Sequence, residues 1–542
     1  MTRFALVCFL AASFLFSSGM HAAAQPCEQL AQLALPNARI TSAQTIAAGT
    51  FTPPAATAAW LIGNPSLYKQ LPAFCRVTAD DKPTPDSDIK IEIWMPTTGW
   101  NGKFRGQGNG GFAGEIDYRS LALAVLQGYA SAATDTGHAA MGTDATWALG
   151  HPEKIIDYAH RAIHEMTSLS KATLKAFYGD APKHSYFASC SNGGRQALME
   201  AQRYPEDYDG ILAGAPANYW THLLSNALYN AQATTLDPDN YIPSSKLPAI
   251  AHAVLAACDA KDGVKDGILN DPRQCHFDPA AILCKQGNSD SCLTNPQVIA
   301  LKKLYEGARD SKGQQVFPGY VPGGEEGQGG WGLWITGPAP GKALLFAFGN
   351  GFFGNMVYAR ADWDYKQAKL DDAVAAADKK FAAVMNSNDP NMKAFQSHGG
   401  KLILYHGWND AAISPLNAIN YYESVQATMG KQQADSFVRL YMVPGMQHCA
   451  GGPGTDVFGE FGISPVNDPQ HNIYLALEEW TEKGAAPATI IASKLEADAG
   501  SVPAGPAAKP KMTRPLCAYP QQAKYKGQGD TNEAASFTCE KP

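Results

Sequence analysis

The sequence of 542 residues has few charged side chains, no run of basic residues and no short repeat. Charged residues make up 17% of the chain, and 43 Lys and Arg against 50 Asp and Glu give a formal net charge of -7. A protein that follows a nucleic-acid backbone needs a basic surface, so nucleic acid is excluded as a partner. The 51 Gly and 36 Pro follow no short period, which excludes collagen-like and solenoid folds.

Long apolar runs are also missing, except at the N-terminus. Arg3 precedes the apolar residues 4–16, and three alanines at 22–24 precede Gln25. This pattern is typical of a secretory signal peptide, and the run is shorter than the roughly 20 residues of a membrane-spanning helix. We therefore expect a signal peptide at 1–24, a secreted or periplasmic protein, and no membrane span.

No CxxC pair occurs among the 11 cysteines, so the ligand spacing of common zinc sites is missing. Cys8 lies in the expected signal peptide, and the even number that remains indicates disulfides in an exported chain. Sequence alone does not fix their connectivity. Short loops favour three pairs and would leave two more: Cys258 with Cys275, Cys284 with Cys292 and Cys517 with Cys539, leaving Cys27 with Cys75 and Cys190 with Cys449.

Periodic segments predict an α/β fold. Strict alternation predicts strands, and apolar residues three and four apart predict helices. We expect strands at 89–95, 129–134, 185–188, 210–214, 401–405 and 437–443, and helices at 159–177, 194–203 and 416–429. This order predicts a parallel sheet with helices on both faces.

The regular alternation is lost between Pro216 and the strand at 401–405, in a stretch rich in Gly, Pro and aromatic residues. Loops without structure rarely exceed about 15 residues, so this stretch must be folded. We expect an α/β domain interrupted by an insertion, here named the lid segment. The predicted divisions are a signal peptide at 1–24, the first part of the catalytic domain at 25–217, the lid segment at 218–388 and the second part at 389–542.

Ser191 lies between a predicted strand and a predicted helix, within Ser189-Cys190-Ser191-Asn192-Gly193. This is a G-x-S-x-G nucleophile elbow with Ser in place of the first Gly. Small neighbours let strand and helix pack closely around a strained serine. The pentapeptide alone is weak, and a helix cap is the alternative role for Ser191. The strand before it and the helix after it favour a nucleophile.

A nucleophilic serine needs a histidine that takes its proton and a carboxylate that orients the histidine. In α/β-hydrolases these residues follow in the order Ser, Asp, His. Asp410 comes just past the strand at 401–405, and His448 just past the strand at 437–443. His406 is the nearest rival base, but its place at a strand end favours a core residue.

Two cysteines flank the candidate serine and histidine, since Cys190 precedes Ser191 and Cys449 follows His448. Bridged cysteines hold their Cα atoms about 4.4–6.8 Å apart, and each chain neighbour adds about 3.8 Å. A bridge between them would therefore place the Cα atoms of Ser191 and His448 within roughly 14 Å. Simple loop closure is the alternative role for such a bridge.

Acyl transfer also needs two donors for the oxyanion. One is expected from the backbone N–H of Asn192, and the other from the glycine-rich loop at 106–111. Gly106, Gly108 and Gly111 also match G-x-G-x-x-G. We discount a dinucleotide site, because no acidic residue ends a second strand about 20 residues further on.

Taken together, Cys190-Ser191, Gly193-Gly194-Arg195, Asp410, His448-Cys449 and the glycines at 451–454 resemble the tannase and feruloyl esterase family. This family also contains mono(hydroxyethyl)terephthalate hydrolase. The similarity runs from Cys27 to Cys539. It implies a disulfide-rich α/β-hydrolase fold with a large lid, the triad Ser191, Asp410 and His448, and oxyanion donors at Gly111 and Asn192. It also implies five disulfides: Cys27–Cys75, Cys190–Cys449, Cys258–Cys275, Cys284–Cys292 and Cys517–Cys539.

The resemblance further implies a structural Ca²⁺ in the lid, at 259–268. Three carboxylates interleaved with glycines can converge on a hard cation that prefers oxygen ligands. The spacing is not that of an EF-hand, and a solvated acidic turn is the alternative from the residues alone. The ligands that the resemblance implies are the side chains of Asp259, Asp262 and Asp266 and the carbonyls of Val264 and Ile268.

The lid segment carries aromatic side chains that could clasp a planar acyl group or form an ordinary core. They are Trp331, Trp334, Phe346, Phe348, Phe352, Phe353, Tyr358 and Trp363. By analogy with the family, Ile413 borders the acyl pocket. No lid arginine of the terephthalate-ester type aligns, and Arg360 is only a nearby candidate, which favours feruloyl or galloyl esters.

The resemblance thus implies a secreted serine carboxylic-ester hydrolase that forms an acyl-enzyme. Its expected partner is a small aromatic ester of feruloyl, hydroxycinnamoyl or galloyl type, derived from plant cell walls or tannins. A hydrolase of mono(hydroxyethyl)terephthalate-type monoesters is the alternative within the enzyme class. A calcium-dependent, non-catalytic polysaccharide-binding module with a vestigial elbow is the alternative from another class.

Overall fold

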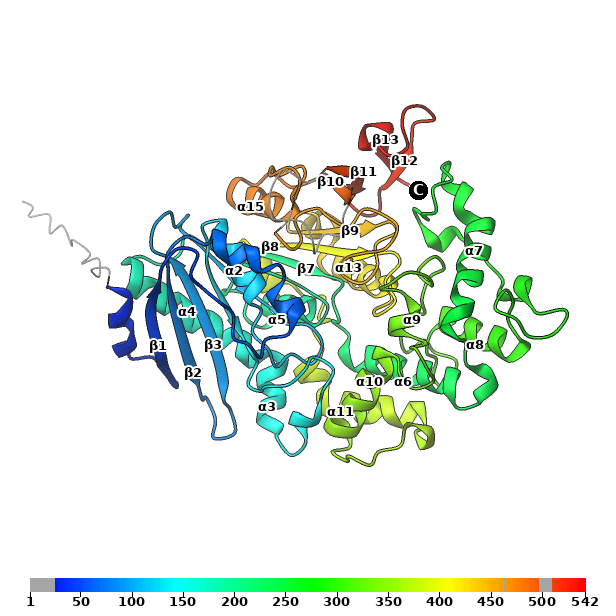
Figure 1. Ribbon diagram of the computed structural model, residues 1–542, viewed down its shortest axis with the longest axis horizontal. Coiled ribbons are helices and arrows are strands. Elements are labelled where there is room, and N and C mark those ends of the chain that lie inside the picture. The colour runs from blue at the N-terminus through cyan, green and yellow to red at the C-terminus, as the bar shows by residue number, and fades with distance from the viewer. Residues whose placement is uncertain (1–24, 463, 497–508) are drawn as a thin grey trace, which may run out of the picture.

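The computed structural model describes residues 25–462, 464–496 and 509–542 (Figure 1). The expected signal peptide at 1–24 lies outside the described residues. A nine-stranded sheet runs through the molecule in the order β1-β2-β3-β5-β4-β6-β7-β8-β9. Its strands are β1 (Ala38–Ile46), β2 (Phe74–Asp81), β3 (Ile89–Pro96), β4 (Lys103–Gln107), β5 (Ala130–Thr134), β6 (His184–Cys190), β7 (Gly210–Gly214), β8 (Lys401–Gly407) and β9 (Val438–Val443).

The sheet is mixed: the parallel arrangement predicted from the sequence holds from β5 to β9, but the strand predicted at 89–95, which is β3, pairs antiparallel. β1 pairs antiparallel with β2, β2 with β3, and β3 with β5, whereas every pair from β5 to β9 is parallel. The carboxyl ends of parallel strands meet at one edge of a sheet. The loops that follow β6, β8 and β9, which carry Ser191, Asp410 and His448, therefore start from the same edge.

Helices cover both faces of the sheet, as expected. Alternate residues of the central strands enter different cores: Phe187 and Ile211 pack with α4 and α13, whereas Tyr186 and Leu212 pack with α15. This alternation follows from the two-residue period of a strand. The helices outside the lid segment are α1 (Ala59–Ile62), α2 (Tyr118–Leu126), α3 (Pro152–Ile156), α4 (Ala162–Tyr178), α5 (Asn192–Arg203), α12 (Lys393–Ser397), α13 (Pro415–Met429), α14 (Lys431–Ala434) and α15 (Ile473–Lys483).

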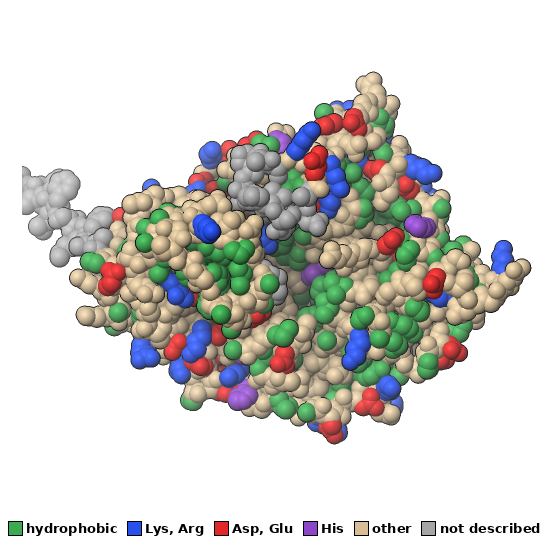
Figure 2. Space-filling view, viewed as in Figure 1, with side chains coloured by type: hydrophobic (Ala, Val, Ile, Leu, Met, Phe, Trp, Pro, Cys, Tyr) green, Lys and Arg blue, Asp and Glu red, His purple; other side chains and the backbone are tan. Residues whose placement is uncertain are grey.

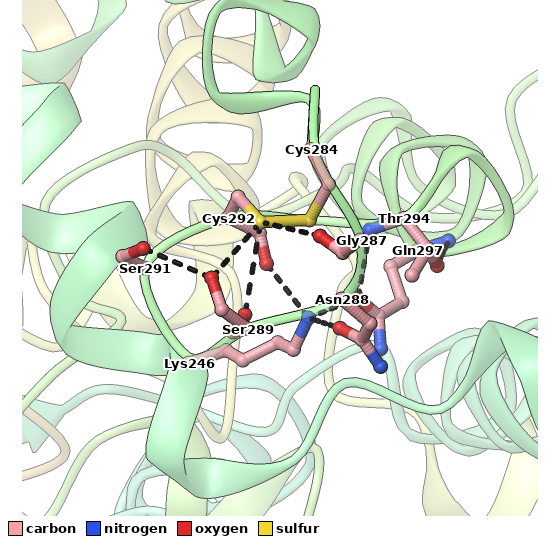
Figure 3. The surroundings of a disulfide bond; sticks show 9 residues. All are labelled: Lys246, Cys284, Gly287, Asn288, Ser289, Ser291, Cys292, Thr294 and Gln297. Carbon is pink, nitrogen blue, oxygen red and sulfur yellow. Dashed lines mark hydrogen bonds between the residues drawn. A yellow bond between two sulfur atoms is a disulfide. The ribbon is translucent and has the colours of Figure 1, made fainter.

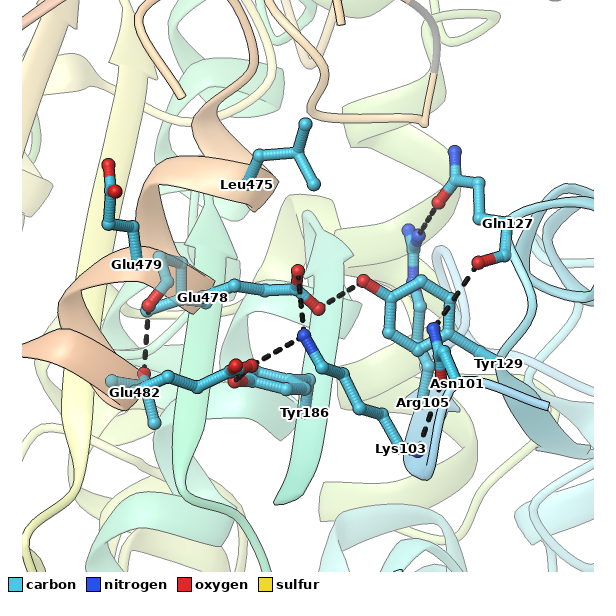
Figure 4. Close-up of polar contacts among 12 residues, drawn as sticks. Asn101, Lys103, Arg105, Gln127, Tyr129, Tyr186, Leu475, Glu478, Glu479 and Glu482 are labelled. Atoms are coloured by element: carbon cyan, nitrogen blue, oxygen red, sulfur yellow. Dashed lines mark hydrogen bonds and ion pairs between the residues drawn. The ribbon is translucent and has the colours of Figure 1, made fainter. Parts of the chain in front are cut away.

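Charged groups fasten α15 to the sheet (Figure 4). The ammonium of Lys103 on β4 lies 3.1 Å from the carboxylate of Glu478 and 2.5 Å from that of Glu482. The hydroxyl of Tyr186 on β6 donates to Glu482 at 2.7 Å, and that of Tyr129 donates to Glu478. Each carboxylate therefore meets both a cation and a hydroxyl donor, which offsets the cost of its partial burial.

The lid segment lies between β7 and β8 and forms the green side of the ribbon in Figure 1. Its helices are α6 (Trp220–Thr235), α7 (Leu247–Cys258), α8 (Asn295–Glu306), α9 (Trp331–Trp334), α10 (Leu344–Gly351) and α11 (Leu370–Met385). Within it, the ammonium of Lys246 donates to Asn288, to the carbonyl of Cys292 and to Gln297, beside the Cys284–Cys292 bridge (Figure 3). The division of the chain into domains stays a prediction.

The C-terminal strands contact the lid segment. β10 (Thr489–Leu495) pairs with β11 (Pro510–Cys517), and β12 (Gln522–Tyr525) pairs with β13 (Phe537–Glu540). Arg514 of β11 forms an ion pair with Asp266 at 2.5 Å. The amide of Gln522 donates to Asp271 at 2.6 Å, so side chains from the end of the sequence hold the loop that follows α7.

Five disulfides join the ten cysteines from Cys27 onward, with Cα–Cα distances from 4.9 to 6.0 Å. They form the pairs Cys27–Cys75, Cys190–Cys449, Cys258–Cys275, Cys284–Cys292 and Cys517–Cys539. Bridges in this number fit an oxidising compartment. In the part of the chain that the structure describes, no helix has the length and apolar character to cross a membrane.

Candidate active site

Ser191 occupies the sharp turn between β6 and α5 with φ 67° and ψ -126°. Such a backbone is strained for a residue with a side chain and persists only where its surroundings hold it. The N–H of Ser191 donates to the carbonyl of Gly214 at 3.0 Å, and its carbonyl accepts from the N–H of Arg195. The side chain makes no hydrogen bond to the helix N-terminus, so the helix-cap interpretation is wrong.

Two glycines allow α5 to begin this close to the sheet. A Cβ atom at Gly193 would lie 1.8 Å from the hydroxyl of Ser189, and one at Gly194 would lie 2.3 Å from the carbonyl oxygen of Gly214. Side-chain atoms do not approach at such distances. The glycines after Ser191 are therefore required by packing, in agreement with the close strand–helix contact that the elbow motif predicts.

A continuous chain of hydrogen bonds links Ser191, His448 and Asp410. The hydroxyl of Ser191 lies 2.9 Å from Nε2 of His448, and Nδ1 of His448 lies 2.8 Å from Oδ2 of Asp410. A carboxylate only accepts hydrogen bonds, so Nδ1 carries the proton and Nε2 is free to accept from the serine. The sheet thus brings the three residues together in the geometry of a nucleophile, a base and an orienting acid.

Asp410 is completely enclosed, yet it remains ionised. Its other oxygen, Oδ1, accepts the N–H groups of Ala412 at 2.8 Å and Ile413 at 2.9 Å. Burial alone would raise the pKa of Asp410, but the electrostatic interaction with His448 and the hydrogen bonds from His406 and His448 hold this pKa well below its ordinary value. The carboxylate can therefore stabilise a positive charge on His448 during proton transfer.

His406 is buried, as expected, but it also contacts the candidate acid. Its Nε2 lies 3.0 Å from Oδ2 of Asp410 and 3.1 Å from the carbonyl oxygen of Ile413. Both neighbours are acceptors, so Nε2 carries the proton. Sequence reasoning missed this contact, although a histidine four residues before the aspartate was a usable signal. The role of Ile413 beside an acyl pocket stays a prediction.

The Cys190–Cys449 bridge stands directly beside the serine and the histidine. Its Cα atoms are 6.0 Å apart, although the two cysteines are 259 residues apart in the sequence. Cys449 also has a positive φ, of 64°. The bridge therefore joins two strained turns and holds the loops of Ser191 and His448 against each other.

Two backbone N–H groups are available near Ser191. Gly111 has φ 53°, and a Cβ atom there would lie 2.3 Å from the carbonyl oxygen of Gly142. Asn192 is the first residue of α5, where an N–H has no partner within the helix. Neither N–H donates to an acceptor among the described residues. Free amides of this kind are what an oxyanion site requires.

Two of the expected lid aromatics reach this site. The ring of Trp334 meets the ring of His448 edge-on, with centroids 5.0 Å apart. Phe348 lies beside Gly111 and packs on Phe112, with ring centroids 5.2 Å apart. The surface is hollowed near the middle of the face in Figure 2, and hydrophobic side chains lie along the rim.

The other predicted aromatics form ring contacts away from His448, although four of them share a core cluster with Trp334 and Phe348. Trp331 lies against Tyr305 and Tyr320, and Phe346 against Tyr365. Phe352, Phe353, Tyr358 and Trp363 pack in one cluster with Phe381. Arg360 is exposed and pairs with Asp362 at 3.1 Å.

The loop predicted to bind Ca²⁺ follows α7. Gly267 N–H donates to Asp259, Asn270 N–H to Asp262 and Ile268 N–H to Asp266. Burial raises the pKa values of Asp262 and Asp266, and the negative charge of Asp259 adds to both, whereas Arg514 partly opposes the rise at Asp266. Its carboxylates and carbonyls are the oxygen donors that a hard cation prefers. Among the described residues, there is no group of three or more His, Cys, Asp or Glu side chains that could hold a metal ion.

A family model described as tannase and feruloyl esterase matches residues 75–540. An uncharacterized esterase from Xanthomonas campestris is 41% identical over 544 residues, which cover 95% of this chain and 91% of that protein. A probable feruloyl esterase B-1 from Aspergillus terreus is 34% identical over 476 residues, 86% of each protein.

Two solved structures have the same fold as this chain. Feruloyl esterase B from Aspergillus oryzae superposes with a TM-score of 0.85 at 28% identity, covering 95% of this chain and 99% of that chain. Tannin acyl hydrolase from Aspergillus niger has the same fold, with a TM-score of 0.72 at 23% identity, covering 96% of this chain and 94% of that chain. The α/β-hydrolase fold expected from the sequence is confirmed.

Proposed function

The chain belongs to the tannase and feruloyl esterase family and is a carboxylic ester hydrolase, and we propose that it cleaves aromatic acyl esters through Ser191, His448 and Asp410. The observation that carries this proposal is the hydrogen-bond chain from the Ser191 hydroxyl through both ring nitrogens of His448 to Asp410.

Hydrolysis proceeds in two steps. His448 takes the proton of Ser191, whose oxygen attacks the ester carbonyl, while the N–H groups of Gly111 and Asn192 hold the developing oxyanion. The alcohol leaves with the proton from His448. Water, activated by the same histidine, then attacks the acyl-enzyme and releases the acid. Asp410 keeps His448 in the required tautomer throughout.

Lid aromatics near the candidate triad support an aromatic acyl group. Trp334 stands beside His448 and Phe348 beside Gly111, and the two rings stack with centroids 6.3 Å apart, so together they offer one aromatic wall against which a planar acyl group would pack. Arg360 pairs with Asp362 at the surface, which leaves the terephthalate monoester as the second candidate substrate behind feruloyl, hydroxycinnamoyl and galloyl esters.

A serine-directed phosphonate tests the enzyme mechanism. We expect it to label Ser191 stoichiometrically, and we expect Ser191→Ala to abolish turnover of p-nitrophenyl esters without changing the melting temperature. Absence of labelling would favour the polysaccharide-binding alternative, and retained turnover in Ser191→Ala would overturn the assignment. Measuring kcat/KM with methyl ferulate, methyl gallate and a terephthalate monoester then ranks the substrates.

Ca²⁺ is the proposed structural ligand of the loop at 259–268, held by the side chains of Asp259, Asp262 and Asp266 and the carbonyls of Val264 and Ile268. The negative charges of Asp266 and Asp259 beside Asp262 support the proposal, since a bound cation would relieve this repulsion, while Arg514 already pairs with Asp266. Binding would draw the side chains closer together than they now lie. We expect a chelator to lower the melting temperature of the wild type but not of Asp262→Asn. An unchanged wild-type melting temperature would contradict the site.

The disulfides and the pattern of residues 1–24 support secretion or periplasmic export, with cleavage before Gln25. N-terminal sequencing of the protein from its native host tests this part of the proposal. A mature chain that still begins at Met1 would exclude it.

A further inference from the structure

Tyr158 contacts both residues of the proposed oxyanion site. It lies in η4 (Asp157–Arg161), a π-helical turn between α3 and α4, and is completely buried. Its hydroxyl is 2.9 Å from the carbonyl oxygen of Gly111 and 3.1 Å from Oδ1 of Asn192. π-helical turns occur often at functional sites, and here the turn aims one hydroxyl at two segments that are far apart in sequence.

Arg195 is the second buried group at this place. Its Nε donates to Oδ1 of Asn192 at 2.8 Å, and its Nη atoms donate to the carbonyls of Ala159, Tyr158 and Met385. The guanidinium is completely buried and lies 5.1 Å from the ring centroid of Tyr158. Within the described ranges, the atoms that accept from this guanidinium are one amide oxygen and three carbonyl oxygens, with no carboxylate.

A cation at this position carries an energetic cost. Burying an unpaired charge is costly, and carbonyl contacts and ring faces offset that cost only in part. Arg195 also lies in the first turn of α5, where the helix dipole disfavours positive charge. Its positive charge therefore stands without a carboxylate partner beside Asn192, one of the two proposed oxyanion donors.

We propose that Tyr158 and Arg195 are positioning residues that hold the two oxyanion donors in place, an inference that rests on the proposed function. Neither residue touches the substrate. They form a support behind the site, since Arg195 donates to Oδ1 of Asn192 and the single hydroxyl proton of Tyr158 is shared between that atom and the carbonyl oxygen of Gly111.

The contacts explain how this support acts on the donors. The peptide between Gly111 and Phe112 is held at both ends, because Tyr158 donates to the carbonyl of Gly111 and the N–H of Phe112 donates to Gly142 at 2.7 Å. The N–H of Gly111 belongs to the preceding peptide, whose carbonyl, that of Gly110, accepts from the N–H of Ala113 at 2.9 Å. Asn192 is held through Oδ1 by Arg195 at 2.8 Å, with Tyr158 sharing its hydroxyl proton with the same atom, and its Nδ2 donates to the carbonyl of Asn109 at 3.2 Å. The N–H groups of Gly111 and Asn192 are left without protein acceptors in the described chain. The positive charge of Arg195 in a dry interior also favours a nearby oxyanion.

Tyr158→Phe tests the support with the smallest possible change, because only the bridging hydroxyl is removed. Loss of a direct oxyanion donor typically costs about 100-fold or more in kcat, so loss of a support should cost less, about tenfold, with KM nearly unchanged. Affinity for an aryl trifluoromethyl ketone, which forms an oxyanion on serine, should fall by the same factor. Affinity for the free acid product should not change.

Tyr474→Phe is the matched control, because Tyr474 is equally buried and its hydroxyl has no partner in the described residues. It should leave every constant unchanged. Rates are normalised by phosphonate titration of Ser191, so a partly unfolded preparation does not imitate a loss of kcat. Arg195→Lys provides a second test, since lysine keeps the charge but cannot reproduce the guanidinium contacts, and its kcat should also fall at constant KM.

The inference is overturned if Tyr158→Phe matches Tyr474→Phe in kcat and in ketone affinity, or if KM rises while kcat is preserved. Failure of the proposed function would look different. In that case the wild type itself would neither react with the phosphonate nor hydrolyse esters.

Discussion

Asn409 and Gln447, which immediately precede Asp410 and His448, bond the same glycine-rich segment of the lid at 323–330. Nδ2 of Asn409 donates to the carbonyl of Gly323 at 2.6 Å. Nε2 of Gln447 donates to the carbonyl of Glu326 at 2.8 Å, and Oε1 accepts the N–H of Gly329 at 3.1 Å. One segment of the lid therefore sets the spacing between the loop of Asp410 and the loop of His448.

Gln447→Leu should lower both stability and kcat/KM. Leucine would leave the carbonyl of Glu326 and the N–H of Gly329 without their partner, at a cost of about 1–3 kcal/mol. The loop of His448 would also lose its contact with the lid. Thermal unfolding and ester hydrolysis measure the two effects. Gln328→Leu is the control, because Gln328 lies exposed in the same segment, and equal effects of the two changes would argue against this coupling.

Removing the Cys190–Cys449 bridge should lower activity as well as stability. The bridge closes a long loop, so replacing both cysteines by serine is expected to cost about 3–5 kcal/mol. It should also lower kcat, since the loops of Ser191 and His448 would no longer be joined. Replacing Cys284 and Cys292 is the comparison, because that bridge spans only 8 residues within the lid segment. Full kcat in the first variant would show that the bridge serves loop closure alone.

Gly111→Ala should lower kcat about 100-fold, the usual result of losing an oxyanion donor. The new Cβ would meet the carbonyl oxygen of Gly142 at 2.3 Å and displace the backbone of Gly111. Gly430→Ala separates this effect from backbone strain alone, because Gly430 has φ 83° and open space around it. That control should lose only about 1 kcal/mol of stability and no activity. Wild-type kcat in Gly111→Ala would remove Gly111 from the oxyanion site.

Asp81→Asn should stabilise the protein at pH 8 but not at pH 4. Burial, with the charges of Glu165 and Asp157, raises the pKa of Asp81 to about 6. The folded state thus binds this proton more tightly than the unfolded state, so stability falls as pH rises from about 4 to 6 and the loss persists above. At pH 8 the substitution should recover about 1–3 kcal/mol.

The comparison for Asp81→Asn is Asp88→Asn. Hydrogen bonds from Lys90 and Lys82 outweigh the effect of burial and lower the pKa of Asp88, so removing this carboxylate should not stabilise at pH 8. Chemical denaturation at both pH values gives the two differences. An Asp81→Asn effect that is the same at pH 4 and pH 8 would refute the titration account.

Local pattern predicted the parallel half of the sheet well. The strand expected at 210–214 is β7, and the helix expected at 159–177 corresponds to α4 with the turn η4 before it. Strand β1 escaped prediction because it is largely exposed and shows no clean alternation. Strand β4 is short and buries the polar side chains of Arg105 and Gln107. Polar residues in so short a segment are more typical of a loop, so the sequence did not indicate a strand here.

The candidate site was predictable where motif and strand order coincide, as at Ser191, Asp410 and His448. Its supporting residues were not. Tyr158, Asn409 and Gln447 act through contacts with residues distant in sequence, and no local spacing indicates such contacts. The burial of the Arg195 guanidinium was also not predictable, because no local pattern indicates that a charged side chain will be buried without a carboxylate partner.

The contacts between the C-terminal strands and the lid segment matter for engineering. Arg514 pairs with Asp266, and Gln522 bonds Asp271. The lid segment therefore cannot be exchanged between relatives as an independent unit in order to change substrate specificity. A chimera that imports a foreign insertion needs the donor's last strands as well, or the transplanted loop will face mismatched charges.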